Sequence, residues 1–350
     1  MGNQCCNNNT DPGLKTDLNA PKAETINPNQ NNDEMLKTFN EKDVEHLVKI
    51  QSTFRGSKVR KEIKNSNFES NVLEDKNSRE NLQQLERFEV FTNEKVEKAS
   101  SKYGKYIYPP NIEDSSLEKK GPVLVENQFV YEGQWKGNKQ HGQGKLQWND
   151  GSLYEGNFEN SMANGKGRLI HIDGDMYEGD WVNDKACGKG IYVHMDNSKY
   201  EGEWEDDKQN GEGIESWPDG AQYKGTYKCG KKHGKGLFTW SDGSYYEGEF
   251  FNNSIQGNGI YKWGDGRSYN GTWLNNKMEG EGIFTWQDGR TYKGGYKEDK
   301  KHGGGEFRWP DGRLFKGSWQ NGKTHGKGTY ISNGVEKTGE WIDGKKIKSN

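Results

Sequence analysis

The sequence has little of what builds an ordinary hydrophobic core. Only 29% of its 350 residues are hydrophobic, another 29% are charged, and the mean hydropathy is −1.23. Values of this kind approach those of disordered chains. No apolar run reaches the roughly 18 residues of a membrane-spanning helix, and the hydrophobic region of a secretory signal peptide is absent. We therefore expect neither one large core nor a secreted or membrane-spanning protein.

Cysteine and excess positive charge are also scarce. The four cysteines, Cys5, Cys6, Cys187 and Cys229, have a spacing that suits neither a disulfide framework nor a zinc site. A reducing cytosol is the simplest compartment for such a chain. The net charge of −3 provides no general attraction to nucleic acid. We expect no metal site, no cofactor and no nucleic-acid partner.

Glycine and tryptophan, in contrast, are abundant and periodic. All 12 tryptophans lie between Trp135 and Trp341, and there are 48 glycines. A Tyr-x-Gly-x-aromatic motif recurs every 23 residues. Its first residues are Tyr131, Tyr154, Tyr177, Tyr200, Tyr223, Tyr246, Tyr269, Tyr292 and Phe315. An exact short period over nine starts is the signature of a repeat architecture. Below, positions in a repeat are counted from this first residue, which is position 0.

Each repeat has the pattern of a β-hairpin. Position 0, the glycine at position 2 and the aromatic residue at position 4 alternate, so they share one face of a strand. A polar turn, a Gly-x-Gly pair and a second strand follow, and an Asp-Gly turn leads to the next repeat. The prediction is a mainly β fold: an elongated single-layer antiparallel sheet, roughly 90 Å long, with one aromatic and one charged face.

These motifs resemble the membrane occupation and recognition nexus (MORN) repeat over about residues 121–345. Gly121 falls where the second-strand glycine of a preceding half-repeat belongs, and Gly339-Glu340-Trp341 arrives one residue early, as a terminal cap would. The resemblance implies protein binding at membrane–cytoskeleton junctions or cilia, and it leaves a homodimer open. We expect partners on the aromatic face. Its proposed residues are Tyr131, Trp135, Trp148, Tyr154, Trp181, Trp204, Trp217, Tyr223, Trp240, Tyr246, Trp263, Trp273, Trp286, Trp309 and Trp319.

The N-terminal tip resembles an acylation signal. Gly2 is placed for N-myristoylation, and Cys5 and Cys6 for palmitoylation, although Cys6 stands where serine or threonine is commonest. One myristoyl chain binds a membrane only marginally, whereas a second acyl chain makes attachment durable. The alternative is a chance Met-Gly start with two idle cysteines. We expect residues 1–39 to be a disordered tether at the cytoplasmic side of a membrane, with a cilium or basal body as further addresses.

Residues 40–65 have the pattern of an amphipathic helix that resembles an IQ motif. Such helices bind calmodulin or related light chains. The residues that carry the resemblance and its implied contacts are Ile50, Gln51, Phe54, Arg55, Gly56, Val59, Arg60 and Ile63. By the resemblance, the apolar members enter the partner's grooves, Gln51 binds its backbone, and the two arginines pair with its acidic surface. The alternative is a basic helix that docks on its own chain or on anionic lipid.

Residues 66–120 are expected to form a linker with a second helix over about 79–98 and an N-terminal cap built on Tyr103, Tyr106, Ile107 and Tyr108. None of the segments carries a catalytic pattern. The histidines before Gly-x-Gly, such as His302 and His325, lie in repeats about 10 Å apart, too far to share a zinc ion. The glycine pairs lack the ending of a phosphate-binding loop.

The sequence therefore predicts a non-enzymatic, membrane-anchored scaffold. Two other hypotheses remain at this point: a phospholipid-binding array, or a regulatory subunit of a phosphoinositide kinase. Interspersed Lys, Asp and Glu weigh against direct headgroup binding, because no block of positive charge is present.

Overall fold

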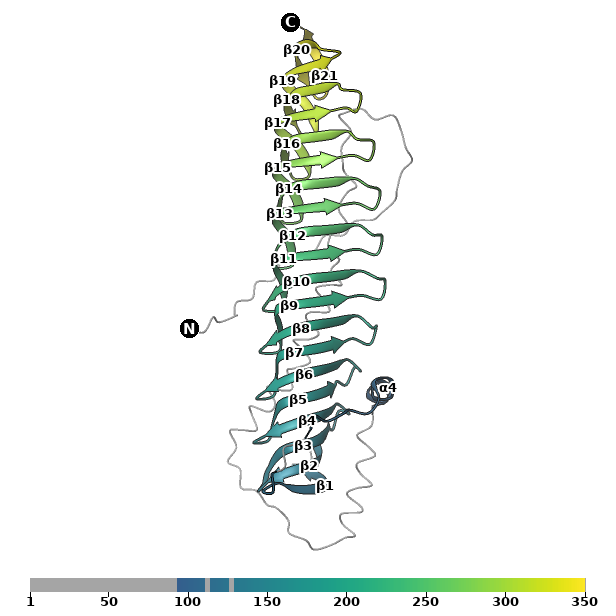
Figure 1. The fold of residues 1–350 in the computed structure, drawn as a ribbon, viewed down its shortest axis with the longest axis vertical. Helices are drawn as coiled ribbons and strands as arrows, with labels where there is room; N and C mark the ends of the chain where they lie inside the picture. Colours follow the sequence, from purple (N-terminus) through teal and green to yellow (C-terminus); the bar gives the residue numbers. More distant parts are fainter. Residues whose placement is uncertain (1–92, 111–113, 126–128, 350) are drawn as a thin grey trace, which may run out of the picture. The chain divides into compact units, whose positions relative to one another are not determined.

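The computed structural model describes residues 93–110, 114–125 and 129–349. These residues belong to two compact units, one up to Ser241 and the other from Asp242, which are described separately below. The first unit contains helix α4 and strands β1 to β11, and the second contains strands β12 to β21 (Figure 1). The predicted mainly β fold of repeated antiparallel hairpins is confirmed.

In the first unit each strand pairs antiparallel with the next one along the chain. Its strands are β1 (Glu118–Val125), β2 (Phe129–Lys136), β3 (Lys139–Trp148), β4 (Leu153–Glu159), β5 (Met162–Ile170), β6 (Met176–Val182), β7 (Lys185–Val193), β8 (Lys199–Glu205), β9 (Lys208–Ser216), β10 (Gln222–Lys228) and β11 (Lys231–Thr239). Strand β1 is the half-repeat that the sequence predicts ahead of Tyr131.

The second unit continues the same hairpin order. Its strands are β12 (Tyr245–Phe251), β13 (Ser254–Lys262), β14 (Ser268–Leu274), β15 (Lys277–Thr285), β16 (Thr291–Lys297), β17 (Lys300–Arg308), β18 (Leu314–Gln320), β19 (Lys323–Ser332), β20 (Val335–Ile342) and β21 (Lys345–Ser349). Strand β20 carries the early Gly-Glu-Trp element, and Trp341 packs edge-on against Phe315 at 5.1 Å between ring centroids.

Turn chemistry fixes the register of each hairpin. Asn160 and Ser161, between β4 and β5, have φ of 51° and 65°, as a two-residue type I′ turn requires. The first glycine of Gly-x-Gly, Gly165 in this repeat, has φ of 92°. The pairing shifts register between Gly156 and Phe158, so each hairpin contains a bulge. A bulge bends its strand and increases the local twist.

Helix α4 (Glu94–Tyr103) is the one helix among the described residues. It begins at Asn93, whose side chain accepts hydrogen bonds from the backbone N–H groups of Lys95 and Val96. It ends at Gly104, whose φ of 70° suits glycine. The helix predicted over 79–98 overlaps α4 only at residues 94–98, and the earlier part of that prediction lies outside the described residues.

Candidate partner-binding surface

The aromatic side chains at positions 0 and 4 form the core of the array. Each tyrosine at position 0 is at most 2% exposed, and each aromatic residue at position 4 is at most 8% exposed. Nine of the residues expected on the partner-binding face fall in these two rows: Tyr131, Trp135, Tyr154, Trp181, Trp204, Tyr223, Tyr246, Trp273 and Trp319. In this structure a partner cannot reach these side chains without opening the fold.

Ring-to-ring contacts explain why these residues are buried. The ring of Tyr131 makes edge contacts with Trp135 of its own repeat and Phe158 of the next, at 5.1 and 5.0 Å between centroids. Tyr154 does the same with Phe158 and Trp181. Each such contact adds about 0.5–1.5 kcal/mol to the burial of the ring itself. Within each unit, a continuous chain of edge contacts therefore replaces a conventional core.

Tryptophans at position 17 are less completely covered. Trp263 is 8% exposed, whereas Trp148, Trp217, Trp240, Trp286 and Trp309 are half-buried. In three successive repeats of the second unit an arginine lies over this ring: Arg267 over Trp263, Arg290 over Trp286 and Arg313 over Trp309, at 5.3–5.6 Å. Of the expected face, these tryptophans are the members with the most accessible area.

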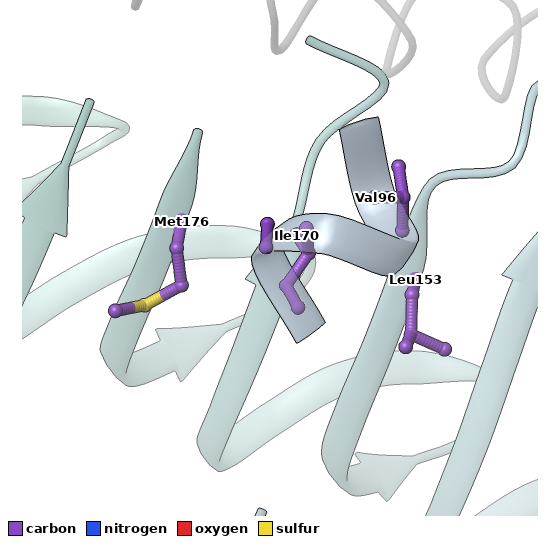
Figure 2. Close-up of a cluster of buried hydrophobic side chains, with 5 residues drawn as sticks. Val96, Leu153, Ile170 and Met176 are labelled. Atoms are coloured by element: carbon purple, nitrogen blue, oxygen red, sulfur yellow. The ribbon is translucent and has the colours of Figure 1, made fainter. Parts of the chain in front are cut away.

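The charged face, opposite the tyrosine rings, is where other parts of the chain dock. Val96 and Ala99 of α4 pack on a row of apolar side chains formed by Leu153, Ile170 and Met176 (Figure 2). Tyr103 and Val193 pack against this cluster. Strand pairing makes Leu153 the neighbour of Ile170, and Ile170 the neighbour of Met176. The row therefore crosses three strands beneath the helix.

We did not predict this apolar row from the sequence, although the residue types at position 16 indicate it. Ile170 and Val193 occupy position 16, on the face where polar residues are expected. In six other repeats this position is polar: Gln147, Ser216, Thr239, Lys262, Thr285 and Arg308. Comparison of repeats, rather than of neighbouring residues, would have located the docking site of α4.

The segment after α4 continues over the same face. We call residues 104–110 the strap. The Arg168 guanidinium donates to the carbonyl of Gly104 at 2.8 Å and lies over the ring of Tyr106, which is buried. Further along, the hydroxyl of Tyr108 donates to the carbonyl of Gly144 at 3.1 Å. Tyr106 and Tyr108 thus pack on the charged face, against Arg168 and the carbonyl of Gly144.

A groove of about 690 Å³ extends along the charged face from the strap. Tyr106, Ile107 and Pro109 form one end, and the groove then crosses the repeats that begin at Tyr177 and Tyr200. Its floor contains paired glycines, and its apolar lining includes Ile191 and Ile214. Ile214 is 38% exposed, close to the 38–42% of Leu237, Ile260 and Ile283 at the same position of later repeats, so the adjacent strap rather than the isoleucine distinguishes this stretch of the face. Among the described residues, this groove is the strongest candidate for a binding site.

Two lysines are buried at position 9, but in different surroundings. Lys232 Nζ lies 2.8 Å from Glu215 Oε2, which also accepts a hydrogen bond from the Tyr227 hydroxyl. Lys301 Nζ lies 4.9–5.4 Å from the ring centroids of Trp286, Tyr292, Phe307 and Trp319. Burial, with a smaller effect of Arg290, lowers the pKa of Lys301 to about 7. Both lysines are inside the fold, so neither is placed to meet a substrate.

The histidine turn residues have structural contacts. The backbone N–H of Asn160 donates to His141 Nδ1, and that of Asp343 donates to His325 Nδ1, each at 3.5 Å from a later turn. Across the described parts of the chain, no three His, Cys, Asp or Glu side chains come together in a way that could hold a metal ion. His194 Nδ1 lies 2.8 Å from Asp175 Oδ2, which also accepts from the Tyr192 hydroxyl, so this histidine serves packing next to α4.

The acylation residues Gly2, Cys5 and Cys6, and the IQ residues from Ile50 to Ile63, lie outside the described part of the chain. Among the described residues, no helix is long and apolar enough to span a membrane.

Solved structures that are similar to this chain share little of its sequence. None of the curated protein sequences matches this chain. Among solved structures, the TCP domain of Drosophila melanogaster SAS-4, in complex with a proline-rich motif of Ana2, is similar at 13% identity, with 55% of this chain and 99% of that one covered and a TM-score of 0.29. Virginiamycin B lyase from Staphylococcus aureus matches at 12% identity over 66% and 87% of the two chains, with a TM-score of 0.15. Neither similarity is close enough to support an argument about fold or function.

The family comparison is decisive. The MORN repeat model matches nine segments: 131–153, 154–176, 177–199, 200–222, 223–245, 246–266, 269–289, 292–312 and 315–334. These segments have the period of the hairpins and together cover more than half of the chain. The protein belongs to the MORN repeat family.

Proposed function

We propose that this protein is a non-enzymatic scaffold that holds a partner protein on the charged face of its repeat array. The observation that supports this proposal most strongly is the groove beside the strap. Ile191, which is half-buried, and Ile214, which is exposed, line it, and two segments of the chain already dock on the same face. This arrangement moves the expected binding surface from the tyrosine and position-4 rings, which are buried, to the opposite face.

The N-terminal region supplies the other functions of the proposed scaffold. Acylation of Gly2 with Cys5 or Cys6 would attach the chain to the cytosolic leaflet, and the IQ helix would recruit calmodulin or a related light chain. Both functions rest on sequence motifs. A membrane–cytoskeleton junction or a cilium is the kind of address that suits such an anchored adaptor.

Proximity labelling in cells tests the scaffold and its address together. The wild-type chain should label membrane-associated neighbours and a calmodulin-type protein. The Gly2→Ala variant should lose the membrane neighbours but keep those that depend on the array. An unchanged set of neighbours with Gly2→Ala would refute acyl anchoring.

Two binding experiments separate the remaining functions. A calmodulin pull-down should fail with Arg55→Glu/Arg60→Glu, and retention of binding would refute the IQ assignment. In liposome flotation, the Gly2→Ala chain should stay unbound at physiological salt. Binding of that variant to anionic vesicles would instead favour an array that reads phospholipids.

A further inference from the structure

We propose that the groove on the charged face binds a proline-rich segment in the polyproline II conformation, with an apolar or aromatic side chain at every third residue. This inference rests on the proposed function, because it names the class of partner that the groove would hold. It follows from the spacing of the repeats, from the strap that already lies on this face, and from backbone acceptors in the groove floor.

The spacing of the repeats selects the conformation of the ligand. Ile191 and Ile214 occupy the same position in successive repeats. Two strands separate them, and at about 4.8 Å per strand the interval is about 9.6 Å. A polyproline II helix returns a side chain to the same side every three residues, a distance of about 9.3 Å. Successive ligand side chains would therefore meet successive isoleucines with a mismatch of only about 0.3 Å.

Other regular conformations fit this interval poorly. In a β-strand, side chains on one side recur about every 6.7 Å, and the next same-side interval is about 13 Å. In an α-helix, seven residues rise about 10.5 Å, so the error grows by nearly 1 Å with every repeat. The groove spans more than one repeat, and polyproline II is the conformation that keeps its register.

The strap shows how such a segment lies on this face. Its sequence, Gly-Lys-Tyr-Ile-Tyr-Pro-Pro, ends in two prolines, which fix φ near −65° and favour an extended conformation at Tyr108. The rings of Tyr106 and Tyr108 contact each other edge-on at 5.0 Å, and the Gln143 side chain donates to the carbonyl of Pro109. Ile107 is 87% exposed and borders the groove. A ligand would continue the surface that the strap begins.

Backbone carbonyls add a preference for tyrosine. At Gly167 and Gly190, the indole N–H of the tryptophan at position 4 of the next repeat donates to the carbonyl, at 3.0 and 3.2 Å. The residue that would do this at Gly144 is Phe158, which has no N–H, and the strap's Tyr108 hydroxyl donates there instead. The chain therefore already contains one hydrogen bond from a tyrosine hydroxyl to the glycine carbonyl at this repeat position.

Gly213, which lines the groove, resembles Gly144 in the residue that follows it at position 4 of the next repeat. The residue at position 4 of the next repeat is Tyr227, and its hydroxyl donates to Glu215. The carbonyl of Gly213 thus lacks the indole donor found at Gly167 and Gly190, as Gly144 does. A ligand tyrosine over Ile214 would bring its hydroxyl to this carbonyl in the manner of Tyr108.

The charged residues at the rim of the groove carry both signs, so they do not favour a strongly charged ligand. They are Glu178, Glu201, Glu203 and Glu212 with Lys166, Lys189 and Lys224. A proline-rich segment with few charges would avoid desolvating an unpaired group in such mixed surroundings. Proline also limits the entropy lost on binding, because its φ is fixed before contact.

Peptide binding to the full-length chain tests this inference. The probe is a fluorescent six-residue peptide of two Pro-Pro-Tyr units, one for each isoleucine of the groove. Its control has the same composition, with the two tyrosines moved off the three-residue spacing. We expect the periodic peptide to bind at least tenfold more tightly in fluorescence anisotropy. Ile214→Glu should weaken it at least tenfold, whereas Ile283→Glu should not, although Ile283 has the same repeat position and similar exposure (42%) outside the groove.

Each contrary result has a distinct meaning. Equal affinity for the two peptides, with both lost in Ile214→Glu, would overturn the three-residue rule but leave a groove that binds partners. Binding that Ile214→Glu leaves intact, or that Ile283→Glu removes equally, would overturn the groove as the site. Failure of both peptides to bind would overturn the ligand class, and partner-dependent labelling would then test the scaffold separately.

Discussion

Lys232 Nζ lies 2.8 Å from Glu215 Oε2, and this ion pair joins two adjacent repeats inside the aromatic core. Glu215 stands at position 15, where the other repeats carry leucine, tyrosine or phenylalanine. A carboxylate buried there requires a partner, and Lys232, only 2% exposed, provides it at position 9 of the following repeat. The two residues therefore act as one unit.

Removal of one member of this pair should be costly, whereas replacement of both should not. We expect Lys232→Met to lower the free energy of unfolding by roughly 3 kcal/mol, because the Glu215 carboxylate loses its counter-charge. The double variant Glu215→Tyr/Lys232→Met copies the residue types of other repeats and should recover most of that loss. Urea unfolding of the two variants measures the difference. Equal destabilisation by both would show that the pair is not coupled.

Replacement of Lys301 by methionine should change the free energy of unfolding in the opposite direction from Lys232→Met. The pKa of Lys301, lowered to about 7 by burial, means that unfolding takes up a proton between about pH 7 and the ordinary lysine range. Stability therefore rises with pH across that window, by at most about 1.4 kcal/mol per unit. The four ring faces around the ammonium offset part of this dependence.

Lys301→Met should thus stabilise the protein near pH 7, and the gain should shrink toward pH 10. The preceding repeat already carries a fully buried methionine, Met278, at this position. Urea unfolding of wild type and variant at pH 6, 7, 8 and 9 measures the effect. A difference that is constant with pH would contradict the lowered pKa.

Adjacent glycines in one repeat test the role of the tyrosine ring. A Cβ at Gly305 would meet the Tyr292 ring, whereas one at Gly304 meets nothing within 4 Å, and neither residue needs a positive φ. We expect Gly305→Ala to cost at least about 2 kcal/mol through overpacking, and Gly304→Ala to stay within about 0.5 kcal/mol of wild type. Thermal unfolding measures both, and similar losses for the pair would refute the ring-over-glycine explanation.

The docking of helix α4 on the charged face should depend on the apolar row of Leu153, Ile170 and Met176. Ile170→Thr, which introduces the residue found at position 16 in other repeats, should cost about 1–2 kcal/mol and expose α4. Trypsin cleavage at Lys95, Lys98 and Lys102 should then accelerate. Ile283→Thr, on an exposed side chain of the same face, serves as the control and should leave cleavage unchanged. Unchanged cleavage in Ile170→Thr would show that this row does not hold the helix.

Much of this fold could be predicted because glycine, tyrosine and the turns each impose a local geometry. The 23-residue period predicts the hairpins and their order along the sheet. Burial could not be predicted in the same way. Alternation shows that Tyr131 and Trp135 share a face, but it does not show that Phe158 of the next repeat packs on Tyr131 and helps to bury that face.

The candidate site was harder to predict for a related reason. Ile191 and Ile214 stand among charged residues on their strands, so a single repeat shows nothing unusual. They line a groove together with the strap, which comes from a different part of the sequence. The strap is held on the same face by hydrogen bonds from Arg168 and Gln143. Contacts between distant segments are not encoded in a local pattern.

Proximity labelling with paired isoleucine variants tests the central claim, that partners bind the charged face at the groove. The first variant is Ile191→Glu/Ile214→Glu, and the matched control is Ile260→Glu/Ile283→Glu, at the same position in other repeats. Our account predicts that the first variant loses the neighbours that depend on the array and that the control keeps them. Retention of the same neighbours by both variants, or their equal loss from both, would contradict it.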